Sequence, residues 1–307
     1  MMSDPEPRSA EGSAPAAGAA AQPAWTVRKV LEWTTQHLQK HGSETPRLDA
    51  EVLLAHARKC RRIGLYTDYD QPLSDAVRAQ MRELVQRRAN AEPVAYLVGH
   101  REFFSLDFAV TADVLIPRPD TETLVLEVIS LVKGKAGARV LDLCTGSGCI
   151  AISVAKNCPA TKVTATDLSA AALTIARKNV ETHQVGDRVE LLPGDLFAAV
   201  PAGATFDVIA SNPPYIPTAE IETLAGDVRR HEPRLALDGG GDGLDLLRRI
   251  LAEGPRHLVP GGWLLVEFSP EQSERLCELA RGVSEYDEVR VQNDLAGQAR
   301  VLLARRK

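Results

Sequence analysis

The sequence predicts an α/β fold in which a mostly parallel sheet follows a small N-terminal helical bundle. Four short apolar runs are separated by helical patterns, an alternation typical of parallel sheets. These runs span residues 139–143, 162–166, 189–192 and 206–211. A glycine-containing loop follows the first run, at the position where such sheets bind nucleotide-like ligands. Earlier residues carry short amphipathic helical patterns, which can bury their apolar stripes only by packing together.

The N-terminal part of the 307-residue chain divides into a tail and a bundle. Residues 1–24 are rich in Ala, Gly, Ser and Pro and hold too few large apolar side chains to form a core. We therefore expect a disordered tail there. Helical patterns begin after Thr26, Thr45 and Ser74, and Thr45 is followed by a proline suited to a first helical turn. Residues 25–92 should form a helical bundle whose surface is the candidate for recognising a substrate partner.

The chain after the bundle is expected to form a hairpin linker and then the catalytic unit. Residues 93–114 alternate aromatic and polar positions, which predicts a hairpin. The catalytic domain then spans residues 115–307. Past the fourth strand, residues 217–243 read as a long functional loop. A helix, a further strand and a closing antiparallel pair at 289–303 complete a seven-stranded sheet.

The run Asn212-Pro213-Pro214-Tyr215, directly after the fourth strand, is the most informative feature of the chain. Both prolines lack N–H donors and cannot extend a sheet, so nearby carbonyl groups are free to accept hydrogen bonds. A planar NH2 group placed here would donate to the Asn212 side-chain oxygen and the Pro213 carbonyl, while Tyr215 covers its face. These four residues are the candidate catalytic residues. The alternative is a turn that only closes a strand above a buried tyrosine.

The glycine loop after the first strand is the first candidate cofactor site. Its candidate binding residues are Cys144, Thr145, Gly146, Ser147 and Gly148. The two glycines permit close approach of a ligand to the backbone. With Ala151 they also match the dinucleotide fingerprint, a weak signal alone.

Acidic residues after the second and third strands extend this site. Asp167 lies about 20 positions after the glycines and suits the ribose hydroxyls of either NAD or S-adenosylmethionine. Asp195 is placed to accept from an adenine amino group, with Leu196 and Phe197 packing on the ring, and Asn212 borders the same site. Alternatively, each aspartate is a turn or helix cap. The strand order brings all these segments to the carboxyl edge of the sheet, where open α/β folds bind ligands.

Composition excludes several classes of protein. The net charge of −5 argues against a general nucleic-acid binder, which usually carries a basic surplus. No apolar stretch approaches the roughly 20 residues needed to cross a bilayer, and no signal peptide is evident, so a cytoplasmic location is expected. The five cysteines form no C-x-x-C pair and no metal-binding set with the histidines. We expect reduced thiols and no metal site.

These motifs together resemble the S-adenosylmethionine-dependent methyltransferases that methylate planar nitrogen, with their Rossmann-like seven-stranded sheet. Further segments are similar to the bacterial-type release-factor glutamine-N5 methyltransferases. The segments that carry this similarity are Pro46–Leu54, Pro93–Phe104, Leu115–Glu122, Glu232–Leu237 and Gly240–Leu244. The resemblance covers about residues 26–305, and the Ile-Pro-Arg-Pro-Asp-Thr-Glu run combined with Asn-Pro-Pro-Tyr is its most specific part.

The resemblance implies S-adenosyl-L-methionine as cofactor and methylation of the glutamine amide in the Gly-Gly-Gln motif of peptide-chain release factors. It implies a protein partner without direct nucleic-acid or membrane contact, and we expect a monomer. It also places Arg118 and Glu122 near the cofactor side of the site, whereas the residues alone are equally consistent with a surface ion pair.

Two other functions compete with this hypothesis. A nucleic-acid amino methyltransferase would share the Asn-Pro-Pro-Tyr run, but it normally needs a basic channel and a way to extrude its base. A nicotinamide dehydrogenase would use the glycine loop and Asp167, but it leaves Asn212 to Tyr215 without a role.

Overall fold

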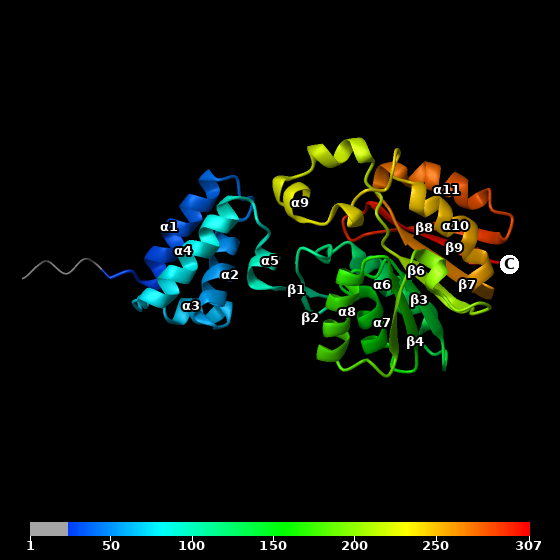
Figure 1. Ribbon diagram of the computed structural model, residues 1–307, viewed down its shortest axis with the longest axis horizontal. Helices are drawn as coiled ribbons and strands as arrows, with labels where there is room; N and C mark the ends of the chain where they lie inside the picture. The colour runs from blue at the N-terminus through cyan, green and yellow to red at the C-terminus, as the bar shows by residue number, and fades with distance from the viewer. Residues whose placement is uncertain (1–23) are drawn as a thin grey trace, which may run out of the picture.

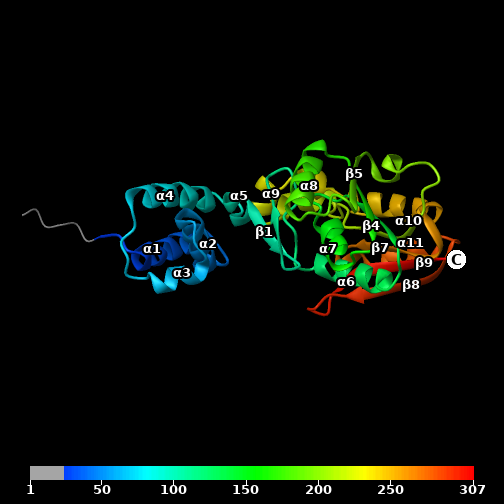
Figure 2. The ribbon, with the colours of Figure 1, turned by 90° about the horizontal axis from the view of Figure 1, so that it is seen from below.

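The computed structural model describes residues 24–307, so the tail expected at 1–24 lies, apart from Ala24, outside the described residues. Figures 1 and 2 show an elongated molecule with a helical bundle at one end and a sheet covered by helices at the other. The α/β fold class predicted from the sequence is therefore confirmed.

The bundle contains short helices that share one apolar core. They are α1 (Val27–Lys40), α2 (Pro46–Arg58), α3 (Arg62–Thr67), α4 (Asp75–Ala89) and α5 (Val94–Val98). Thr26 and Ser74 cap α1 and α4, each accepting a hydrogen bond from a backbone N–H three residues later. Thr45 makes no such bond, because its hydroxyl donates to the Asp49 carboxylate at 3.0 Å.

The hairpin is shorter than the sequence suggested. Its strands are β1 (His100–Phe103) and β2 (Leu106–Ala109), joined by a two-residue turn in left-handed backbone conformation. Residues 94–98, which were expected to belong to it, form helix α5 instead. The reason is that Leu97 packs into the core of the bundle. The hairpin and α5 link the two ends of the molecule (Figure 2).

The sheet has seven strands within the described residues, in the order β5-β4-β3-β6-β7-β9-β8. Their bounds are β3 (Arg139–Leu143), β4 (Lys162–Asp167), β5 (Val189–Pro193), β6 (Phe206–Ser211), β7 (Leu258–Glu267), β8 (Tyr286–Asn293) and β9 (Ala299–Arg306). The five strands from β3 to β7 are parallel, while β9 runs antiparallel to both β7 and β8. This confirms the predicted seven-stranded, mostly parallel sheet.

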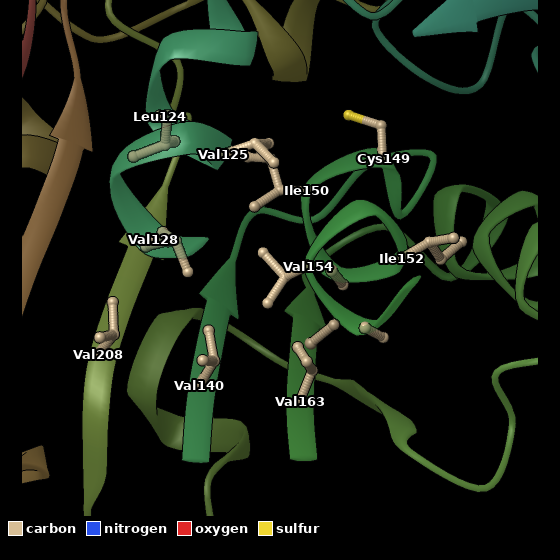
Figure 3. Packing of buried hydrophobic residues seen from close by; sticks show 14 of the residues in the cluster. Leu124, Val125, Val128, Val140, Cys149, Ile150, Ile152, Val154, Val163 and Val208 are labelled. Atoms are coloured by element: carbon tan, nitrogen blue, oxygen red, sulfur yellow. The ribbon is translucent and has the colours of Figure 1, made fainter. Parts of the chain in front are cut away.

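Helices cover both faces of the sheet. One face carries α6 (Thr121–Val132), α7 (Cys149–Asn157) and α8 (Ala170–Thr182); the other carries α10 (Asp245–His257) and α11 (Ser273–Arg281). Figure 3 shows Val128 of α6 and Val154 of α7 above Val140 and Val208 of the central strands. Because the central strands are buried on both faces, they read as continuous apolar runs.

The segment between β6 and α10 contains short helices and crosses towards the bundle. These are η2 (Thr218–Thr223), α9 (Gly226–His231) and η3 (Arg234–Ala236). Asp227 of α9 lies 4.0 Å from Arg88 of the bundle, and His231 contacts the Asn90 carbonyl at 3.4 Å. Both views show α9 close to α5, between the bundle and the sheet.

Candidate active site

The sheet register brings the ends of four strands to one level. Leu143, the last residue of β3, pairs with Thr166 of β4 and with Ser211 of β6. The end of β4 pairs with the end of β5. The glycine loop, Asp167, Asp195 and Asn212 therefore emerge side by side at the carboxyl edge of the sheet, as predicted from strand order alone.

These residues line an open cleft that encloses about 1000 Å³, including solvent at its mouth. The predicted site residues that line it are Cys144, Thr145, Gly146, Ser147, Asp167, Asp195, Leu196, Asn212 and Pro214. The cleft has a mainly apolar lining with a few polar groups, as is usual for ligand sites. The glycine loop, Asp167 and Asp195 in this lining suit an adenosine derivative such as S-adenosylmethionine.

Two carboxylates shape the glycine loop. Asp142, fully buried on β3, accepts from the Thr145 hydroxyl at 2.6 Å and from the Ala151 N–H at 3.2 Å. Burial raises the pKa of Asp142 to about 7, against the lowering effect of these two hydrogen bonds. Asp167 accepts from the Gly146 N–H at 2.8 Å, and burial also raises its pKa. Asp142 on β3 and Asp167 on the neighbouring strand β4 therefore both stabilise the loop.

Gly148 has a structural part in the loop. It caps α7 with φ of +81°, and a Cβ there would lie 3.1 Å from the side chain of Ile152. The position therefore requires glycine for both its backbone angle and its packing.

Of the residues after β5, Asp195 and Leu196 line the cleft, whereas Phe197 lies in the core. Asp195 borders the cleft and forms an ion pair with Arg249 of α10 at 2.9 Å. Leu196 lines the cleft and is nearly buried. Phe197 was expected to pack on a ligand ring, but it belongs to the core beneath α10 and stacks on His257 with ring centroids 4.6 Å apart. The structure does not bring Phe197 into the cleft, because successive residues of this short helical turn point in different directions.

Asn212 lines the cleft, and so does Thr121, with which it is in contact. The Asn212 side-chain nitrogen donates to the Thr121 hydroxyl oxygen at 3.1 Å, and its Oδ1 makes no hydrogen bond within residues 24–307. Pro214 lines the cleft and Pro213 is buried. The Tyr215 hydroxyl instead donates to the buried Glu267 carboxylate at 3.3 Å, and its ring packs against the sheet core. Of the four candidate catalytic residues, Asn212 and Pro214 line the cleft.

The charged residues of the Ile-Pro-Arg-Pro-Asp-Thr-Glu run do not pair with each other. Arg118 lines the cleft and forms an ion pair with the buried Glu232 at 2.6 Å. Glu122 accepts from the Phe104 N–H in the hairpin turn at 3.0 Å. Arg118 thus belongs to the cleft wall, while Glu122 attaches the hairpin to α6.

Several cleft residues have no predicted role. Thr121 lies within the Ile-Pro-Arg-Pro-Asp-Thr-Glu run, but its contact with Asn212 joins segments 91 residues apart. Leu168 and Leu235 also line the cleft and are more than half exposed. A search for apolar residues directly after a strand-end aspartate would have found Leu168.

No histidine or lysine side chain lines the cleft in the described part of the chain. Burial raises the pKa of the Cys144 thiol to about 12, so the thiol stays protonated near neutral pH. Within residues 24–307, no group of three or more His, Cys, Asp or Glu side chains is arranged to hold a metal ion. None of the helices in this described part is long and apolar enough to cross a membrane.

Two family models match the chain. The "PrmC N-terminal domain" model matches residues 29–99, and the "Methyltransferase small domain" model matches residues 118–242. The first match covers the bundle and α5, and the second covers the glycine loop and the Asn-Pro-Pro-Tyr run. A solved methyltransferase from Pyrococcus furiosus shares the fold at 23% identity and a TM-score of 0.50, covering 74% of this chain and 98% of that one.

Curated relatives extend over nearly the whole chain. A release factor glutamine methyltransferase from Rhodopirellula baltica is 49% identical over 282 residues, which is 91% of this chain and 95% of the relative. Another, from Geobacter sulfurreducens, is 49% identical over 81% of this chain and 86% of the relative. With this identity over this length, the resemblance deduced from the motifs is confirmed, and the chain belongs to the release factor glutamine methyltransferase family.

Proposed function

We propose that this protein transfers a methyl group from S-adenosylmethionine to the side-chain amide nitrogen of the glutamine in the Gly-Gly-Gln motif of peptide-chain release factors. The observation that carries the proposal is the hydrogen bonding of the Asn212 side chain. Its amide nitrogen donates to Thr121, its oxygen makes no hydrogen bond within residues 24–307, and the residue lines the cleft. Asn212 is therefore proposed as the acceptor for an N–H group of the substrate.

Hydrogen bonding by Asn212 and Pro213 addresses the main difficulty of this reaction. A carboxamide nitrogen is a poor nucleophile because its lone pair is delocalised into the carbonyl. Acceptance of its two N–H hydrogens by the Asn212 Oδ1 and the Pro213 carbonyl raises electron density on nitrogen and disperses the positive charge that develops during transfer. When bound, S-adenosylmethionine supplies an activated methyl group. Correct alignment of the amide is worth up to about 7–11 kcal/mol in well-oriented systems.

The other cleft residues are proposed to hold the cofactor. Asp167 would accept from the ribose hydroxyls, since it borders the cleft beside the glycine loop. Asp195 would accept from the adenine amino group, with Leu196 against the ring. Phe197 has no part in this proposal, because it packs in the core.

The bundle at residues 25–92 is proposed to recognise the release factor. Ile63 is 68% exposed and borders a groove that also contains Leu48 and Arg62. An exposed apolar group beside cations is typical of a protein-binding surface. Ile63→Glu should raise the KM for the release factor with little change in cofactor affinity. An unchanged KM would remove this groove from the proposed recognition surface.

The proposed function is tested by locating the transferred methyl group. Purified protein is incubated with release factor and labelled S-adenosylmethionine, and the Gly-Gly-Gln peptide is analysed by mass spectrometry. We expect one added methyl on the glutamine, and no incorporation when that glutamine is replaced. Efficient labelling of DNA or RNA, with the factor unmodified, would instead support the nucleic-acid alternative.

We also propose that the protein acts as a cytoplasmic monomer without contacting nucleic acid.

A further inference from the structure

Side chains from distant segments hold the Asn-Pro-Pro-Tyr turn. The Asn212 nitrogen donates to Thr121 at the start of α6 at 3.1 Å. At the other end of the turn, Tyr215 donates its hydroxyl to Glu267 of β7 at 3.3 Å. Gln272 donates to the Tyr215 carbonyl at 2.8 Å. The geometry of the turn therefore depends on groups outside its own sequence.

Glu267 lies beside Asn212 because of the sheet register. Val266 of β7 pairs with Ser211 of β6, so the next residue on each strand stands at the same level. Glu267 is only 1% exposed, and its Oε2 has no hydrogen-bond partner of regular geometry within residues 24–307. A buried carboxyl oxygen that can still accept a hydrogen bond therefore lies near the residues that hold Asn212.

The surroundings of Glu267 include a donor for this position. Burial raises the pKa of Glu267 to about 7, and the strongest opposing influence is the Thr121 hydroxyl, followed by the charge of Arg300 on β9. The Tyr215 hydroxyl also favours the carboxylate, whereas the nearby Asp120 disfavours it. This influence indicates that the Thr121 hydroxyl, which contacts Asn212, also lies near the Glu267 carboxylate, although no hydrogen bond of regular geometry joins these two groups.

The single hydroxyl hydrogen of Thr121 determines which group donates in its contacts with Glu267 and Asn212. A carboxylate can only accept, whereas a hydroxyl has one hydrogen to donate and lone pairs that accept. When the Thr121 hydrogen points to Glu267, the Thr121 oxygen is left only as an acceptor for Asn212. An Asn212 amide rotated by 180° would then place its oxygen against those lone pairs. The arrangement thus selects one of the two amide orientations.

We propose that Thr121 and Glu267 are positioning residues for methyl transfer, which fix the Asn212 amide with its oxygen available to the substrate nitrogen. Glu267 orients the Thr121 hydroxyl, and Thr121 holds the NH2 end of Asn212. Neither residue contacts the reacting atoms in this account. The inference rests on the proposed function, because it concerns the acceptor role of Asn212.

The test is a double-mutant cycle at about pH 8.5, where Glu267 with its pKa of about 7 is ionised, under single-turnover conditions with saturating release factor and S-adenosylmethionine. Thr121→Val should lower the transfer rate about tenfold, as expected for loss of one neutral hydrogen bond that acts on the transition state. KM for the factor and affinity for S-adenosylhomocysteine should not change. Thr121→Ser keeps the hydroxyl and should restore most of the rate. In an Asn212→Ala background, Thr121→Val should have no further effect.

A second variant and a control separate positioning from folding. Glu267→Gln keeps the shape but can donate to Thr121, so it should also slow transfer about tenfold and lose this effect in the Asn212→Ala background. Ser153→Ala removes a fully buried hydroxyl from α7, outside the cleft lining, and should leave the rate unchanged. Equal rate losses from Thr121→Val with and without Asn212 would overturn the positioning proposal alone. A normal rate for Asn212→Ala itself would overturn the proposed function and this inference with it.

Discussion

The glycine loop and the Asn-Pro-Pro-Tyr turn lie at the same edge of the sheet but are stabilised in different ways. The loop is held by Asp142 directly before it and by Asp167 on the adjacent strand, both of which accept from loop residues or from the helix that follows. The turn is held by Thr121, Glu267 and Gln272, between 52 and 91 residues away. The loop is thus largely a local structure, whereas the turn is assembled by the whole domain.

This difference separates the expected effects of substitution. Changes in the loop should mainly affect cofactor binding, because the loop has free space above it. Changes around the turn should affect stability and rate together, because its supports are buried. The following predictions test this contrast in order of decreasing expected effect.

Gly243→Ala should destabilise the protein most. Gly243 has φ of +77°, and a Cβ there would overlap the Tyr215 carbonyl oxygen and lie 2.5 Å from the Gln272 side-chain nitrogen. The resulting steric strain against Tyr215 and Gln272 should lower the free energy of unfolding by about 4 kcal/mol. Denaturant unfolding measures this, with Gly241→Ala as control because a Cβ there meets nothing within 4 Å. Equal losses for both variants would contradict the packing described for the turn.

Glu267→Gln should change how stability depends on pH. The pKa of Glu267 in the folded protein is about 7, above the ordinary value of 4.5, because the side chain is buried. The folded state therefore binds this proton more tightly than the unfolded chain, and wild-type stability falls relative to the variant as pH rises from about 4.5 to 7. The difference in unfolding free energy should change by on the order of 3 kcal/mol over this range. Parallel stability curves for the two proteins would contradict this account of Glu267.

Asp167→Ala should weaken cofactor binding. The substitution removes the proposed ribose contacts, and each hydrogen bond to an ionised group is worth about 1.5–3 kcal/mol. Calorimetric titration with S-adenosylhomocysteine measures the change, with the exposed Asp187→Ala as control. Unchanged affinity would remove Asp167 from the cofactor site.

Gly146→Ala should have the smallest effect on stability. Gly146 has φ of +55°, but a Cβ there would meet nothing within 4 Å. Only the cost of the left-handed backbone remains, about 1 kcal/mol. Thermal unfolding compared with Gly243→Ala tests the contrast directly. A loss as large as that of Gly243→Ala would show that the loop is as tightly packed as the turn.

The same contrast explains what could be predicted from the sequence. The parallel strands and the carboxyl-edge position of Asp167 and Asn212 could be predicted from local apolar runs and from the order of the motifs along the chain. Residues 94–98 are too short a run to distinguish helix from strand, and the packing of Leu97 in the bundle decides for a helix. The side chain of Phe197 points into the core beneath α10, which depends on how that helix packs on the sheet. The contact of Asn212 with Thr121 joins segments 91 residues apart. Neither has a local signal.

The central claim is that Asn212 accepts a hydrogen bond from the reacting amide during methyl transfer. The most direct test is the single-turnover rate of Asn212→Ala with saturating release factor and S-adenosylmethionine, together with a measurement of cofactor affinity. The account predicts a loss of roughly 10²–10³-fold in rate, as for other preorganised polar groups at developing charge, with cofactor affinity nearly intact. A rate close to that of the wild-type protein would contradict it.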